Sequence, residues 1–132
     1  MTTTVVALLD SLRTHLAEFE LPDLCSVHVT RSASEPNVTA QLASHTPPQI
    51  TGALLTWADT LTEVTVEAWR VPSGDSVHLS VLARLPDGAS IQIYGAMPFT
   101  KHGIGADLPP DTSTTVSLTV LRERATLGQV TV

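Results

Sequence analysis

The residues of this chain that could do chemistry are mainly its five histidines and thirteen carboxylates, and they form no recognisable catalytic motif. The spacings of zinc-binding His-Glu-x-x-His, of the Gly-x-Ser-x-Gly elbow and of the glycine-rich phosphate and dinucleotide loops are all missing. His28 and His78 fall on the outer side of predicted strands, where Glu67 could join them in a metal or acid–base site if those strands were neighbours. His15 and His45, on or beside helices, are expected to be solvated. The favoured interpretation is no catalytic residue, no metal and no cofactor.

Two further candidates, the 101–105 segment and Cys25, also favour structural interpretations. The segment combines a lysine with two glycines, as phosphate loops do, but it follows a strand and no helix is predicted after it. Cys25 is the single cysteine, so it cannot form an internal disulfide, and we interpret it as a small hydrophobe at the entry to a strand. A reducing compartment, and a fold that needs neither disulfide nor metal, fit these observations.

The formal net charge is −6, with seven basic residues against thirteen acidic ones. The basic residues are scattered, apart from Arg122 and Arg124, whereas nucleic-acid binding depends on clustered lysine and arginine. No run approaches the roughly 18–20 apolar residues of a membrane span, and the first residues do not have the basic start of a signal peptide. We therefore expect a soluble cytoplasmic protein that binds neither nucleic acid nor membrane.

The elements that must position the polar side chains follow a helix–strand–strand pattern twice, over 5–43 and 47–85. The second helix begins with the capping box Thr46-Pro47-Pro48-Gln49, and Trp57 lies on its apolar face. The first helix, over 5–20, has one apolar face made of Val5, Leu8, Leu9, Leu12, Leu16 and Phe19.

Alternating apolar residues predict the strands, which are expected at 26–30, 37–43, 63–70, 76–85, 89–97 and 114–121. The tail, 128–132, is either a further short strand or disordered, and 98–113 is a long loop without periodicity. The predicted fold class is α+β: one antiparallel sheet of four to six strands with two helices packed on one face. The element order is α-β-β-α-β-β-β-(β), and residues 1–132 are expected to form a single domain.

The register of the 63–97 meander can be predicted, because the valines must share one face. Val81 then lies opposite both Val66 and Ile93, and the three-residue turn at 86–88 fits this pairing. On the outer face, the register predicts four cross-strand rows: Trp69 and His78; Glu67, Ser80 and Tyr94; Thr65, Leu82 and Gln92; Arg84 and Ser90.

This outer face differs from an ordinary solvated sheet face, which is rich in threonine, lysine, glutamate and serine. Its aromatic, leucine, histidine and arginine side chains are typical of a recognition surface. The candidate partner-binding residues are Trp69, Leu82, Tyr94, His78, Glu67, Gln92 and Arg84. Burial of this face under the tail strand or the 98–113 loop remains an alternative.

The leading functional hypothesis is a non-catalytic protein-interaction or accessory protein that self-associates, as a homodimer, through the outer face. An acidic chain without catalytic motifs could also be an accessory or inhibitory subunit that binds a more basic partner protein. The alternative is a small-molecule binding protein or small enzyme. Its pocket would lie between the outer face and the 98–113 loop and would use Trp69, His78, Tyr94 and His102.

Overall fold

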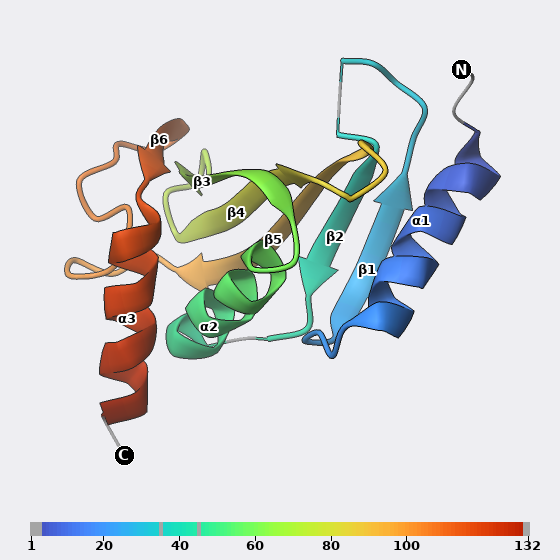
Figure 1. Ribbon diagram of the computed structural model, residues 1–132. Helices are drawn as coiled ribbons and strands as arrows, with labels where there is room; N and C mark the ends of the chain where they lie inside the picture. The colour runs from blue at the N-terminus through green and yellow to red at the C-terminus, as the bar shows by residue number, and fades with distance from the viewer. Residues whose placement is uncertain (1–3, 35, 45, 131–132) are drawn as a thin grey trace.

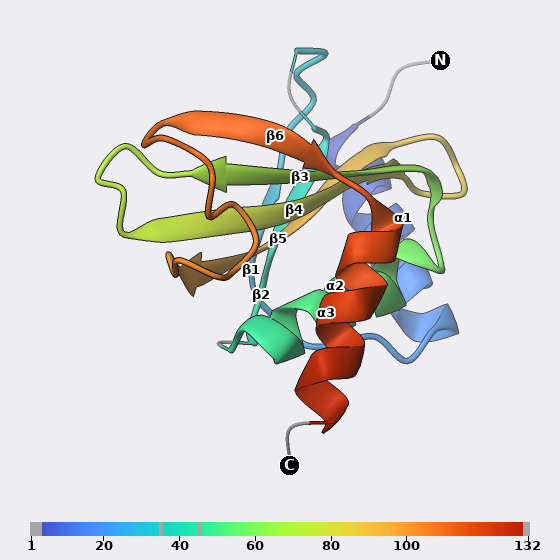
Figure 2. The ribbon, with the colours of Figure 1, turned by 90° about the vertical axis from the view of Figure 1, so that its left-hand side faces the viewer.

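The computed structural model describes residues 4–34, 36–44 and 46–130, without the side chains of 126–130, so His45 and residues 131–132 lie outside it. Its elements are helix α1 (Val5–Glu18), strands β1 (Leu24–Val29) and β2 (Val38–Leu42), helix α2 (Pro47–Ala58), strands β3 (Thr62–Arg70), β4 (Ser76–Arg84), β5 (Ser90–Pro98) and β6 (Thr112–Val116), and helix α3 (Leu118–Val130). The α+β class is confirmed. Figures 1 and 2 show the three helices on the same side of the sheet, with α2 between α1 and α3.

The six strands form one mixed sheet in the order β1-β2-β5-β4-β3-β6, so the prediction of a purely antiparallel sheet is wrong. Strands β2 and β5 pair in parallel, with Val38 opposite Ile91. The reason lies in the connections. Helix α2 returns the chain along the sheet, so β3 runs in the same direction as β2, and the two hairpins that follow reverse the chain twice. Strand β5 therefore meets β2 in parallel.

The predicted register of the β3–β4–β5 meander is confirmed. Val81 pairs with Val66 on one side and with Ile93 on the other, and Trp69 lies opposite His78. A slip of one residue would turn every buried side chain of a strand toward solvent, so the apolar alternation determines the pairing. Gly88, with φ of 98°, supplies the left-handed conformation that the β4–β5 turn requires.

The core lies between the helix layer and the inner sheet face. Leu12 of α1, Trp57 of α2 and Leu121 of α3 all belong to the same buried cluster as the inward residues of the strands. Strand β5 presents Gly95 to α2, and a Cβ there would lie only 2.7 Å from the Ile50 side chain. The glycine thus lets α2 pack close against the sheet.

The strand predicted over 114–121 exists only as far as Val116, as β6, and helix α3 takes the place of its second half from Leu118 on. The predicted count of two helices is therefore wrong. Strand β6 ends at Val116, and the chain then turns into a helix that continues to Val130. Neither alternative for 128–132, a further short strand or disorder, holds as far as residue 130, which belongs to α3; residues 131–132 lie outside the described residues.

The physical reason for this difference is a helix start that the sequence interpretation missed. The Ser117 side chain accepts a hydrogen bond from the Val120 backbone N–H at 3.2 Å, as an N-cap does. From there Leu118 and Leu121 are spaced for one helix face, and Leu121 is fully buried whereas Val120 is exposed. The alternation of Val116, Leu118 and Val120 fits a strand equally well, so the pattern alone was ambiguous.

Helix α1 buries only part of its predicted apolar face. Leu8 and Leu12 are buried, whereas Val5, Leu9 and Leu16 are all more than 40% exposed. Figure 1 shows α1 at the end of the helix layer, alongside β1, which is an edge strand. A helix at the end of a layer has core on one side only, so half of its apolar stripe remains in contact with solvent.

Candidate functional site

The three described helices all lie on the other side of the sheet from its outer face, and the long loop between β5 and β6 packs mainly on the helix side. Phe99, Ile104 and Leu108 of this loop pack against the core. Arg70 anchors it, because its guanidinium lies 3.6 Å from the centre of the Phe99 ring and donates a hydrogen bond to the Leu108 carbonyl oxygen at 2.9 Å. On the described residues, neither the tail nor this loop is seen to cover the outer face.

Three aromatic rings form a diagonal row across β3, β4 and β5 on the outer face of the sheet. Trp69 meets His78 edge to face with ring centres 5.3 Å apart, and His78 stacks on Tyr94 at the same distance. The ends of the row are held by hydrogen bonds: the Trp69 Nε1–H donates to Asp111 Oδ1 at 3.3 Å, and the Tyr94 hydroxyl donates to Gln41 Oε1 at 3.3 Å. These contacts make the row a fixed, half-buried platform rather than a set of loose exposed side chains.

A hollow of about 300 Å³ lies beside this row and is lined by Glu67, Trp69, His78, Ser80, Gln92 and Tyr94. The amide of Gln92 donates to the Ser80 hydroxyl at 3.1 Å, so these two side chains satisfy each other in part. The Glu67 carboxylate makes no hydrogen bond or ion pair with any other residue that the structure describes. The hollow therefore joins an unpaired carboxylate to aromatic ring faces, a combination that attracts cations.

Burial lowers the pKa of the His78 imidazole below its ordinary value of 6.5. The ring is therefore neutral at pH 7 and adds no positive charge to oppose a cation in the hollow. Its position between Trp69 and Tyr94 supplies a third ring to the platform.

The lowered pKa predicts that acid destabilises the fold through His78. The unfolded chain takes up a proton near pH 6.5, whereas the folded ring resists protonation, so the free energy of unfolding should fall as the pH drops below about 6.5. Urea unfolding of the wild type and of His78→Gln at pH 7.5, 6.5 and 5.5 checks this. The variant should show a shallower decline, though not a flat one, because burial also lowers the pKa of His15. Equal slopes would contradict the prediction.

The structure places most of the predicted partner-binding residues together. Trp69, Glu67, His78, Gln92 and Tyr94 line one hollow, as the register implied. Leu82 lies one row away, opposite Gln92, and Arg84 lies beyond it, where its Nε pairs with Glu63 Oε2 at 2.9 Å.

No residue of the 98–113 loop lines the hollow. His102, the loop residue that the alternative hypothesis would use, is exposed. The outer-face side chains that the alternative hypothesis requires are therefore in place, but the 98–113 loop does not form a wall of the hollow.

The conditional site of His28, His78 and Glu67 does not form. Strands β2 and β5 separate β1, which carries His28, from β4, which carries His78. The described residues contain no group of histidine, cysteine and carboxylate side chains with the geometry to hold a metal ion.

Two expectations for single residues are corrected. Cys25, interpreted as a small hydrophobe, is exposed, with its Sγ 3.6 Å from the Leu42 carbonyl oxygen, because β1 is an edge strand. His15, expected to be solvated, is only 2% exposed. The signal for its burial was its spacing from Leu8 and Leu12, which places all three on one face of the helix.

Comparison with known proteins gave no relative: no family model matches the chain, and no curated protein or solved structure shows a significant similarity. Over the residues described, none of the helices combines the length and the apolar character that a membrane span requires. Functional inference therefore rests on the geometry of the chain itself.

Proposed function

We propose that this chain is a non-catalytic interaction protein that binds a partner protein through its outer sheet face, with an arginine or lysine side chain of the partner in the hollow. The observation that carries the proposal is the position of Glu67. Its carboxylate lines a hollow together with Trp69 and Tyr94 and has no partner among the described residues. A cation placed there would gain both a charge-assisted hydrogen bond and contact with aromatic faces.

The size of the hollow supports a single side chain as its occupant. Its volume of about 300 Å³ is at the lower limit of small-molecule pockets. In the part of the chain that the structure describes, its lining comes from β3, β4 and β5 alone, so a small molecule there would keep much of its surface in water. A side chain presented by a protein avoids this difficulty, since the surrounding sheet face contributes the rest of the contact area.

Charge favours a foreign partner over a second copy of the chain. Two copies would bring together net charges of −6 each. In the described part of the outer face, the basic side chain available from a second copy is Arg84, which is already paired with Glu63. The aromatic rings are also half-buried, whereas the largest exposed apolar side chains lie on the helices and β1. Self-association through this face, the original expectation, therefore becomes an outcome to test.

The test begins with capture of proteins from the native host on immobilised wild-type chain, followed by affinity measurement with the purified partner. Trp69→Ala should weaken binding by about 2 kcal/mol or more, as interface tryptophans do. Glu67→Gln should cost a similar amount, because it leaves the partner's cation desolvated without a counter-charge. Leu82→Ala, one row away, should have a smaller effect.

The matched control is Asp59→Asn, which removes an exposed carboxylate on the helix side and should leave the affinity unchanged. A partner that binds Trp69→Ala and Glu67→Gln as tightly as the wild type would contradict the proposal. Light scattering supplies the other outcome: if the wild type exceeds 14.0 kDa and Trp69→Glu restores the monomer, the face joins two copies of the chain instead.

A further inference from the structure

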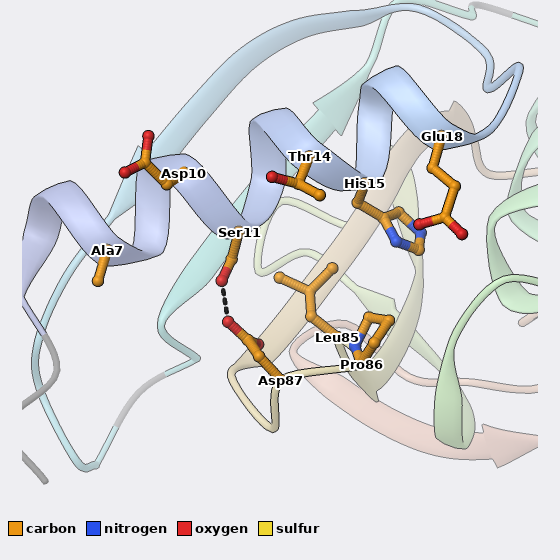
Figure 3. A pocket seen from close by; sticks show the side chains of 9 residues that line it. All are labelled: Ala7, Asp10, Ser11, Thr14, His15, Glu18, Leu85, Pro86 and Asp87. Carbon is orange, nitrogen blue, oxygen red and sulfur yellow. Dashed lines mark hydrogen bonds between the residues drawn. The ribbon is translucent and has the colours of Figure 1, made fainter.

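A second hollow, of about 440 Å³, lies on the helix side between α1 and the β4–β5 turn. Figure 3 shows it from close by. One wall is a face of α1, and the other is the turn segment that follows β4. Its lining residues are Ala7, Asp10, Ser11, Thr14, His15, Glu18, Leu85, Pro86 and Asp87. This site shares no residue with the outer-face hollow.

His15 is the buried polar residue among those that line this hollow, and one of its two ring nitrogens has no partner among the described residues. The Thr60 hydroxyl donates to the Trp57 carbonyl oxygen at 2.8 Å, so the Thr60 oxygen is left to accept from His15 Nε2–H at 2.7 Å. A neutral ring protonated at Nε2 must carry a bare lone pair at Nδ1. That nitrogen is buried and makes no hydrogen bond to any described residue.

The unpaired acceptor faces the hollow. Figure 3 shows a ring nitrogen of His15 directed toward Leu85 and Pro86 on the opposite wall. Phe19 and Trp57 pack against the ring, with centres 4.9 and 5.8 Å away, and hold it in this orientation. A buried acceptor without a donor keeps its desolvation penalty, so a ligand that donates to Nδ1 would recover free energy.

The rest of the lining selects a positively charged donor with an apolar stem. Glu18 lies close enough to His15 to act on its pKa, and Asp87 accepts a hydrogen bond from Ser11 across the hollow (Figure 3). The described lining contains no lysine or arginine. Leu85 and Pro86 supply apolar surface between the carboxylates.

We propose that this hollow binds a primary alkylammonium group. The ammonium donates one hydrogen bond to His15 Nδ1, its charge is balanced by Glu18 and Asp87, and its alkyl stem packs on Leu85 and Pro86. The group is either that of a free aliphatic amine or that of a lysine side chain on another protein.

The probe for this site is n-butylammonium, with 1-butanol as a neutral counterpart. Long-range ¹H–¹⁵N correlation spectra report on both ring nitrogens of His15, whose signals are assigned by their absence from His15→Gln. Saturable binding with a dissociation constant on the order of 1–10 mM is expected for so small a ligand. The Nδ1 resonance should move on saturation, and 1-butanol should bind more weakly.

Glu18 and Asp87 are exposed, so replacing either carboxylate tests the binding site without disturbing the fold. Glu18→Gln and Asp87→Asn should each weaken n-butylammonium binding by about 3–5-fold, whereas Glu20→Gln, just beyond the C-terminal end of α1 and outside the hollow, should not. Nα-acetyl-lysine amide distinguishes a lysine side chain of another protein from a free aliphatic amine. If it binds as tightly as n-butylammonium, the ligand is a protein lysine. If it does not bind, the ligand is a free amine. Absence of saturable binding, or binding unaffected by Glu18→Gln and Asp87→Asn, would overturn the proposal.

Discussion

Replacing Trp57 with alanine is expected to lower the free energy of unfolding by about 3–5 kcal/mol. Trp57 is fully buried between α2 and the sheet and stacks on His15. Its removal leaves a large cavity that the surrounding side chains cannot fill, and the lost dispersion contacts add to the lost hydrophobic transfer. Urea unfolding followed by circular dichroism measures the change.

The matched control is the other tryptophan of the chain. Trp69→Ala should cost only about 1–2 kcal/mol, because Trp69 is half-buried and loses an edge-to-face contact with His78 and a hydrogen bond to Asp111. The outer face would have to be buried inside the folded chain for the two losses to be equal, and such a result would remove the basis of the proposed partner site.

Replacing Leu121 with alanine is expected to lower the free energy of unfolding by about 2–5 kcal/mol. Leu121 is fully buried and is the α3 residue that enters the main core cluster. Its truncation opens a cavity where α3 packs against the core. Urea unfolding again measures the loss.

Val120→Ala is the control, since Val120 precedes Leu121 and is 37% exposed. A helix places these neighbours about 100° apart, so the control should change the unfolding free energy by no more than about 0.5 kcal/mol. If Val120→Ala were the more damaging substitution, the segment would follow the strand pattern of the original prediction, and the helical assignment of α3 would be wrong.

The local elements with a strong period or cap were predictable from sequence. The capping box at Thr46–Gln49 places the start of α2, where the Thr46 hydroxyl accepts from the Gln49 backbone N–H. The meander register followed from apolar alternation between short turns. Because cross-strand neighbours are set by register, the pairs Trp69–His78 and Ser80–Tyr94 were predictable as well. The stacking of His78 on Tyr94 is a diagonal contact between neighbouring rows, which the predicted rows did not include.

The pairing of β2 with β5 could not be predicted from local pattern. Val38 and Ile91 are far apart in sequence, and the alternation of β2 is satisfied by any neighbour that buries its inner face. The direction of the pair depends on how α2 and the two hairpins carry the chain back, a property of the whole path.

The choice between strand and helix after Val116 was likewise made by tertiary packing. Over so short a segment, Leu118 with Val120 fits the period of a strand and Leu118 with Leu121 fits that of a helix. Docking beside α2 buries Leu121, which the strand pattern would have left on the polar side. Burial of a whole leucine outweighs the weak local preference.

The sequence by itself determined which side chains share a strand face or a helix face, because side-chain direction follows the local period of 2.0 or 3.6 residues. It therefore predicted the composition of the outer face. Only the tertiary structure decided that the 99–111 loop packs on the helix side, that Glu67 lies unpaired beside the rings, and that α1 is rotated to bury His15. These outcomes depend on the relative positions of whole elements, which are set by long-range packing and not by the neighbours of a residue along the chain.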